Sequence, residues 1–185
     1  QGPVVGVTAA SAPSTTAQVT LITGDVVMVD TQNGRSAISV TRPDGTPTSK
    51  YHSYSVDKDV YVIPFDAQPL LASGQLDQQL FNVTGLIAQG YDDAHSTSIP
   101  LIARYARGKA AAPTAPAGSR VKFGLPSIRG AALGADKKQA ATFWEAVDDD
   151  SPRGHTPKAR LAGGLDRLWL DGKAQATLDQ SVPQI

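Results

Sequence analysis

The chain of 185 residues carries 17 Lys and Arg against 17 Asp and Glu, so its formal net charge at pH 7 is zero. That balance argues against proteins that bind nucleic acid or anionic membranes, because their affinity comes from a basic face. The absence of cysteine excludes a disulfide scaffold, a thiol nucleophile and a zinc site with Cys ligands. Apolar residues make up 41% of the chain, enough for a globular core, and no apolar run approaches the roughly 20 residues that span a bilayer.

Residues 1–17 are rich in Ala, Ser, Thr and Pro and show no lasting periodicity, which is typical of a flexible leader. Order is expected to begin near Gln18. Two turn signals follow, a Gly-Asp pair at 24–25 and an Asn-Gly pair at 33–34, and each is suited to a tight hairpin. The strand residues expected around them are Val19, Leu21, Val27, Val29, the stretch 37–40 and the β-branched run 60–63 that Pro64 ends.

The middle of the chain combines a short helix, a segment of ambiguous type and a strand. Asp66 is the expected N-cap of the helix, and Gly74 is its expected C-terminal stop. Residues 76–89 have apolar positions at helical spacing, but a Thr-Gly pair within them weakens a helix, so the pattern leaves their type open. Residues 99–105 are expected to form a buried strand.

Residues 106–119 form an Ala/Pro/Gly tract that we expect to be a linker or an exposed loop. A strand over 121–128, interrupted by Pro126, is expected after it. The remaining expectations near the C-terminus are a polar loop at 148–164 and a closing hairpin with strands at 165–170 and 174–178.

Residues 136–147 give the clearest helical pattern in the sequence. Asp136 is a good N-cap, and Gln139 follows three residues later, as in a capping box. Apolar residues recur on one side and are expected to face the core. This stripe consists of Ala140, Phe143, Trp144 and Val147.

Together these elements predict an α+β protein in two main parts. Residues 18–105 would form a β-rich N-terminal subdomain, and residues 120–180 an α/β subdomain. A leader at 1–17, the linker at 106–119 and a short C-terminal tail at 181–185 complete the expected organisation.

The sequence offers no convincing catalytic set. His52, His95 and His155 each lie in a polar, loop-like setting, and there is no G-x-S-x-G turn. Consecutive aspartates at 92–93 and 148–150 lack the alternate-position spacing of a calcium loop. We therefore expect surface histidines, solvated acidic turns, no metal or other cofactor, and no enzymatic activity of the chain itself.

Two further patterns have an ordinary interpretation. The Asn-Val-Thr triplet at 82–84 matches the N-glycosylation acceptor, but such triplets arise by chance and its neighbours are core-like. Trp144 and Trp169 have the aromatic surface of a sugar-binding platform. Both lie in apolar periodic stretches, so we expect both to pack in the core.

Several short stretches carry a family likeness through their order and spacing. They are QVTLITGDVVMV at 18–29, DVYVIPFDAQPLLASG at 59–74, LDQQLFNVTGLIAQGYDDA at 76–94, IPLIARY at 99–105, GLPSIRGAAL at 124–133 and LDRLWLDGKAQATLDQSVPQI at 165–185. This ordered set resembles the long N-terminal propeptides of secreted actinomycete (Streptomyces-type) subtilisin-like serine peptidases of family S8. The likeness covers nearly all of residues 18–185 apart from the loop tracts.

The resemblance implies a dual role for the chain. Such a propeptide helps its peptidase to fold and then stays bound as an inhibitor until it is degraded. The implied partner is therefore the cognate catalytic domain, and the implied location is extracellular. No catalytic residue is implied, because none of the matched motifs is catalytic in the family. For residues 120–180 the resemblance implies an open-faced antiparallel α/β sandwich, whose exposed helix or sheet face contacts the enzyme.

The last five residues are the expected protease-binding site. An extended tail can add as a strand within the substrate cleft, as a cleaved product would, and the proline in it disfavours a helix there. If cleavage follows Ile185, this side chain fills the primary specificity pocket. The expected contacts are Ser181, Val182, Pro183, Gln184 and Ile185.

Two other hypotheses are open on the sequence alone. The first is a free-standing protease inhibitor or binding module of the same architecture without an attached peptidase, which the reading frame after Ile185 would distinguish. The second is a small hydrolase that uses one of the histidines. Replacement of all three histidines without loss of a detected activity would exclude it.

Overall fold

The computed structural model describes residues 14–106, 115–149, 160–162 and 164–172. In these residues the chain is of mixed α and β type with antiparallel sheets, which confirms the expected α+β class. The strands are β1 (Ser14–Thr20), β2 (Val26–Gln32), β3 (Arg35–Thr41), β4 (Pro47–Thr48), β5 (Tyr51–Val56), β6 (Asp59–Pro64), β7 (Ser98–Tyr105), β8 (Ser119–Leu125), β9 (Gly130–Asp136), β10 (Asp148–Asp149), β11 (Arg160–Leu161) and β12 (Leu165–Leu170). The α-helices are α2 (Gln68–Ala72), α3 (Val83–Ala88) and α4 (Ala140–Val147), and the 3-10 turns are η1 (Phe65–Ala67), η2 (Gln78–Phe81), η3 (Pro126–Ile128) and η4 (Lys137–Gln139).

The first four strands form a sheet in the order β1-β2-β3-β4, built on the two predicted hairpin turns. Gly24 (φ 91°) lies in the β1–β2 turn, and Asn33 (φ 53°) with Gly34 (φ 77°) forms the β2–β3 turn, so both turns use left-handed backbone. β1 begins at Ser14, which means that residues 14–17 belong to a strand rather than to the expected leader. Pairing with β2 holds them in place, and their own composition does not reveal that pairing.

β5 and β6 form a separate two-stranded sheet, in which β6 is the predicted strand that ends at Pro64. Val62 and Ile63 of β6 are buried. β5, which the sequence pattern did not reveal, is exposed along most of its length. Tyr54 and Tyr61 stack across the pair with their ring centroids 5.1 Å apart.

The middle helices differ in part from the prediction. α2 is followed by the expected Gly74 at a φ of 82°, but Asp66 does not cap it, because neither η1 nor α2 has a side-chain cap. The ambiguous segment 76–89 folds as η2 followed by α3. Asn82 separates these two elements, and its side-chain oxygen accepts a hydrogen bond of 3.0 Å from the Gly85 N–H, which makes it the N-cap of α3.

The clearest predicted helix is confirmed, although it starts as a 3-10 turn. Asp136 Oδ1 accepts a hydrogen bond of 3.0 Å from the Lys138 N–H at the start of η4. α4 continues from this turn, beginning at Ala140. The whole predicted apolar stripe is buried, namely Ala140, Phe143, Trp144 and Val147.

A four-stranded antiparallel sheet has the order β12-β7-β9-β8. β7, β8 and β12 lie where strands were expected, but the central strand β9, with the sequence GAALGAD, was not predicted. Glycine and alanine are poor strand formers. The position nevertheless requires a small residue, because a Cβ added at Gly130 would lie 2.1 Å from the Ala103 carbonyl oxygen.

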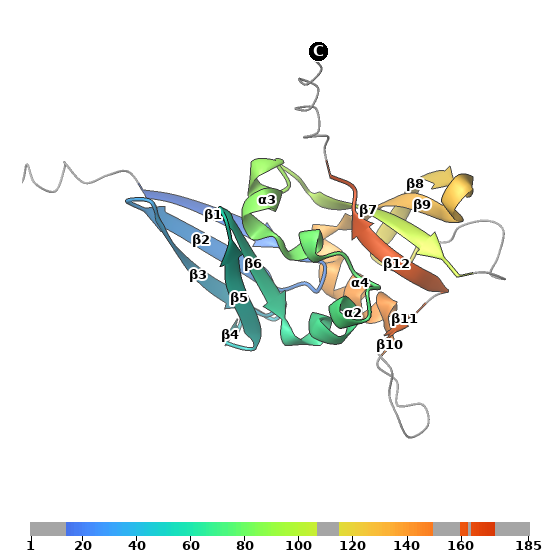
Figure 1. Ribbon diagram of the computed structural model, residues 1–185, viewed down its shortest axis with the longest axis horizontal. Coiled ribbons are helices and arrows are strands. Elements are labelled where there is room, and N and C mark those ends of the chain that lie inside the picture. Colours follow the sequence, from blue (N-terminus) through green and yellow to red (C-terminus); the bar gives the residue numbers. More distant parts are fainter. Residues whose placement is uncertain (1–13, 107–114, 150–159, 163, 173–185) are drawn as a thin grey trace, which may run out of the picture.

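The expected linker at 106–119 does not separate two cores. β7 precedes it in the chain, yet β7 pairs with β9 and β12, which both follow it. Buried side chains from both sides of the tract, such as Phe81 and Phe143, belong to one hydrophobic cluster. Figure 1 shows the strands β1–β6 on one side of the molecule and the β12-β7-β9-β8 sheet on the other, with the helices between them. In the described part of the chain, residues 18–105 and 120–180 therefore share a single core.

Candidate functional site: the outer face of the four-stranded sheet

The β12-β7-β9-β8 sheet has two different faces, because side chains alternate along each strand. One face belongs to the core: Ile99, Leu101 and Ala103 of β7 are at most 4% exposed and lie in the hydrophobic cluster with their register partners on β9. The opposite face is called the outer face below. It comprises Ile102 and Arg104 of β7, Gly130, Ala132 and Gly134 of β9, Arg120, Phe123 and Leu125 of β8, and Arg167 and Trp169 of β12.

An apolar row crosses all four strands of the outer face. Trp169 is the register partner of Ile102, Ile102 of Ala132, and Ala132 of Phe123. Phe123 is 56% exposed, whereas Ala132 is buried between larger neighbours without belonging to the core cluster. Helices α2, α3 and α4 direct all their buried side chains except Ala140 into that cluster. Within the described residues these helices therefore leave the other three members of the row, Trp169, Ile102 and Phe123, uncovered.

The two tryptophans do not share the predicted environment. Trp144 lies in the core, as expected, but the same prediction is wrong for Trp169, which is partly exposed on the outer face. The Arg167 guanidinium lies 5.5 Å from the centroid of the Trp169 ring. A register shift after Leu165 changes the alternation within β12, so the leucines on either side of Trp169 face the core instead.

Two arginines lie directly opposite each other beside Trp169. Arg167 of β12 and Arg104 of β7 are register partners, and like charges in such a pair destabilise a sheet. Arg104 Nε donates to Asp166 Oδ2 at 2.9 Å. The two arginines, Trp169 and Asp77 line a shallow hollow of about 330 Å³. Two guanidinium groups beside an aromatic ring are suited to binding a carboxylate.

Two more cations lie at the β8 edge of the same face. Arg120 and Lys122 are exposed and lie on the strand that carries Phe123. The Lys122 side chain extends over β9, because a Cβ added at Gly134 would lie 3.1 Å from its Cε and 3.9 Å from its Nζ. Arg120 also lines a hollow of about 490 Å³ at this end of the sheet, with Asp136 and Lys138 on its other side.

The predicted protease-binding tail falls outside the described residues, and so do His155 and Asp150. The ring of His52 contacts Phe65, with the centroids 4.8 Å apart. His95 Nδ1 lies 2.7 Å from Asp92 Oδ1, but the Ser96 hydroxyl donates to the Ser98 carbonyl oxygen and not to this ring. The tail residues concerned are Ser181, Val182, Pro183, Gln184 and Ile185.

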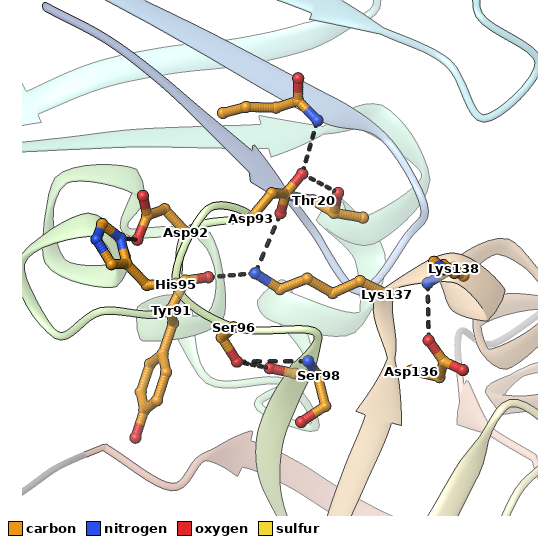
Figure 2. A network of polar contacts seen from close by, with 11 residues as sticks. Thr20, Tyr91, Asp92, Asp93, His95, Ser96, Ser98, Asp136, Lys137 and Lys138 are labelled. Atoms are coloured by element: carbon orange, nitrogen blue, oxygen red, sulfur yellow. Dashed lines mark hydrogen bonds and ion pairs between the residues drawn. The ribbon is translucent and has the colours of Figure 1, made fainter.

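The prediction of a solvated acidic turn is wrong for Asp92 and Asp93. Asp92 is 5% exposed, and Asp93 is the centre of the polar network in Figure 2. The Asp93 carboxylate accepts hydrogen bonds of 2.7–3.1 Å from the backbone N–H and hydroxyl of Thr20, from the Gln18 amide and from the Lys137 ammonium. Burial by itself raises the pKa of Asp93, but these hydrogen bonds outweigh it and lower the pKa below its usual value.

The other candidate sites have structural explanations in the described part of the chain. Asn82 of the glycosylation triplet is 4% exposed and caps α3, so its amide is not accessible in the folded chain. No group of three His, Cys, Asp or Glu among the described residues could hold a metal ion. None of the described helices is long and apolar enough to cross a membrane.

Sequence reasoning missed the outer face as a candidate site. Arg167 and Trp169 alternate with core leucines, and Phe123 lies between charged or small neighbours, so the polar–apolar alternation was a usable signal. The central strand β9, which fixes the two faces, gave no such signal.

Comparison of the chain with protein-family models, curated proteins and solved structures finds no match.

Proposed function

We propose that this chain is the propeptide of a secreted subtilisin-like serine peptidase, which assists folding of the catalytic domain and then inhibits the mature enzyme. The outer face carries this proposal. An antiparallel sheet with its core and α4 on one side presents Trp169, Ile102 and Phe123 on the other. This arrangement is compatible with the open-faced sandwich that the family resemblance implies. A contiguous apolar row on a surface supports a role in binding another protein.

The body of the propeptide acts on folding through its binding free energy. A surface that binds the native peptidase better than the unfolded one stabilises the native state. If the same contact is present in the folding transition state, it also accelerates folding. The outer face is suited to this role because its four strands are fixed from behind by a single core, so little ordering is needed on binding.

Inhibition is assigned to the C-terminal tail, residues 181–185. An extended segment can pair with the edges of the substrate cleft as an added strand. Docking of the body raises the effective concentration of the tail at the cleft, so a weak tail contact suffices. Pro183 has no N–H to donate, and a missing hydrogen bond of that kind costs about 1 kcal/mol.

Titration of peptidase activity tests this function. A panel of bacterial subtilisin-type peptidases is incubated with increasing amounts of the full chain and, in parallel, with a version that ends at Asp179. We expect inhibition that fades as the chain is digested and that is lost in the shortened version. If no peptidase is inhibited and none refolds faster in the presence of the chain, the proposal is wrong.

Two exposed phenylalanines provide a matched pair for testing the outer face. Phe123 lies on that face and is 56% exposed, whereas Phe65 is 45% exposed beside β5. We expect Phe123→Ala to weaken inhibition by about 2 kcal/mol, the loss typical of an aromatic anchor, and Phe65→Ala to leave it unchanged. Equal inhibition by the two variants would place the docking surface elsewhere.

A further inference from the structure

We infer that the surface covering the outer face is acidic around an apolar centre, and that its carboxylates bind Arg104 and Arg167 at one end and Lys122 at the other. The identity of the partner, a peptidase surface, rests on the proposed function. The chemistry of the partner follows from the charges of the outer face itself.

The outer face has an excess of positive charge, although the whole chain is neutral. Asp166 is already bonded to Arg104. Asp77 lies at the rim, where its carboxylate accepts hydrogen bonds from two backbone N–H groups, at 3.1 and 3.4 Å. Asp136 and Lys138, which line the hollow beside Arg120, offset each other. Against the other two carboxylates stand four cations, so the excess is two positive charges. The cations are Arg104, Arg120, Lys122 and Arg167.

The arginine pair is an unfavourable arrangement within the free chain. Arg167 and Arg104 face each other across β12 and β7, and their repulsion is only partly offset by Asp166. A carboxylate placed in the hollow beside Trp169 would contact both guanidinium groups and remove this repulsion. Stacking on Trp169 holds Arg167 in place and leaves the edge of its guanidinium group for such a contact.

The same charges disfavour two other occupants of the face. A second copy of the chain would bring its own arginines and lysine against those of the first. Nucleic acid is disfavoured because an excess of two charges is far below the roughly 6–10 phosphate contacts of specific binders. An acidic protein surface matches both the apolar row and its flanking cations.

A carboxylate probe tests the chemistry without any peptidase. The ¹⁵N-labelled full chain is titrated with acetylated tetraglutamate, and with acetylated tetralysine as the opposite-charge control. We expect tetraglutamate alone to shift the Trp169 indole and the Arg104 and Arg167 Nε resonances, and Arg167→Glu to abolish the shifts of Trp169 and Arg104. The inference would be overturned by equal shifts in Arg167→Glu or by shifts that occur only elsewhere in the chain. It would also be overturned if a single-stranded oligonucleotide, titrated in the same way, bound more tightly than tetraglutamate.

Charge-reversal variants test the same chemistry on the partner. Binding of peptidases whose catalytic Ser is replaced by Ala is measured for the full chain and for Arg167→Glu and Lys122→Glu, with Arg35→Glu on the β2–β3 hairpin as a control of equal charge change. We expect each outer-face variant to weaken binding about tenfold at low salt and to flatten its salt dependence. Arg35→Glu should bind like the unmodified chain.

The outcomes separate the two proposals. Tetraglutamate shifts without binding of any peptidase would contradict the proposed function and leave the acidic-partner inference standing. Equal peptidase binding by the outer-face variants and the unmodified chain would contradict the acidic-partner inference and leave the proposed function standing. Misfolding is excluded by thermal unfolding, because Arg167→Glu converts a like-charged pair with Arg104 into an opposite-charged one and should not lower the melting temperature.

Discussion

The ammonium group of Lys137 lies 3.1 Å from Oδ1 of Asp93, and their side chains are only 6% and 19% exposed. The contact joins the turn that leads into α4 to β1, because Asp93 also accepts two hydrogen bonds from Thr20. Segments more than 40 residues apart in the chain are thus held together by one carboxylate. The network contributes to the fold, and it makes stability depend on pH.

Replacement of Asp93 by Asn should destabilise the chain strongly. It leaves the Lys137 ammonium shielded from water without its counter-charge, which typically costs about 3 kcal/mol. Urea unfolding at pH 7 measures the change. Asp30→Asn is the matched control, because Asp30 accepts one hydrogen bond from the Thr16 hydroxyl on the exposed side of the β1–β2 pair. A loss as small as that of the control would show that the network does not hold these segments together.

The lowered pKa of Asp93 fixes the direction of the acid response. A carboxyl whose pKa is lower in the folded state stabilises the fold fully above its unfolded value, about 3.9. This contribution is lost as the pH falls through the lower, folded pKa. The difference in unfolding free energy between the unmodified chain and Asp93→Asn should therefore shrink below about pH 4. Urea unfolding between pH 2 and 6 tests this, and a constant difference would contradict it.

Asp25 should respond to pH in the opposite direction. Burial raises its pKa, and the Thr23 hydroxyl and Arg42 offset this only in part. Arg42 Nη1 lies 3.4 Å from Asp25 Oδ1, yet this oxygen has no hydrogen bond within the described residues. A raised pKa means that stability is lost as the pH rises through the folded value.

The corresponding variant is Asp25→Asn. We expect it to raise the free energy of unfolding at pH 7 by roughly 1 kcal/mol, because a neutral amide is less costly to bury than a carboxylate of which one oxygen lacks a hydrogen bond. The same comparison at pH 3 is the control, since the gain should vanish where the carboxyl is protonated. A loss of stability at pH 7 would show that the Arg42 contact outweighs the burial cost.

Gly130 and Gly124 offer a paired test of the central strand. A Cβ at Gly130 would lie 2.1 Å from the Ala103 carbonyl oxygen, whereas a Cβ at Gly124 meets nothing within 4 Å. Gly130→Ala should therefore destabilise the chain by about 3 kcal/mol or more through overpacking. Gly124→Ala should be neutral or stabilise it slightly. Urea unfolding with circular dichroism compares the two, and similar values would mean that β9 tolerates a side chain at this position.

Local chemistry made several elements predictable. The turns at Gly24 and at Asn33–Gly34 require left-handed backbone, which these residues adopt at low cost, so the first hairpins could be located from the sequence. The buried stripe of α4 was predictable for a similar reason, because helical periodicity is set within a few turns. These features depend on residues that are close together in the chain.

The sequence by itself therefore determined the α+β class, the first hairpin turns and the core side of α4. Only the tertiary structure decided that GAALGAD is a central strand, because close packing against β7 selects its small residues against their own propensity. It also decided that Trp169 lies outside the core, through a register shift in β12, and that Asp93 is partly buried and hydrogen-bonded, through partners more than 40 residues away. The burial of a side chain and the face of the sheet on which it lies depend on pairing between distant segments, which local composition does not encode.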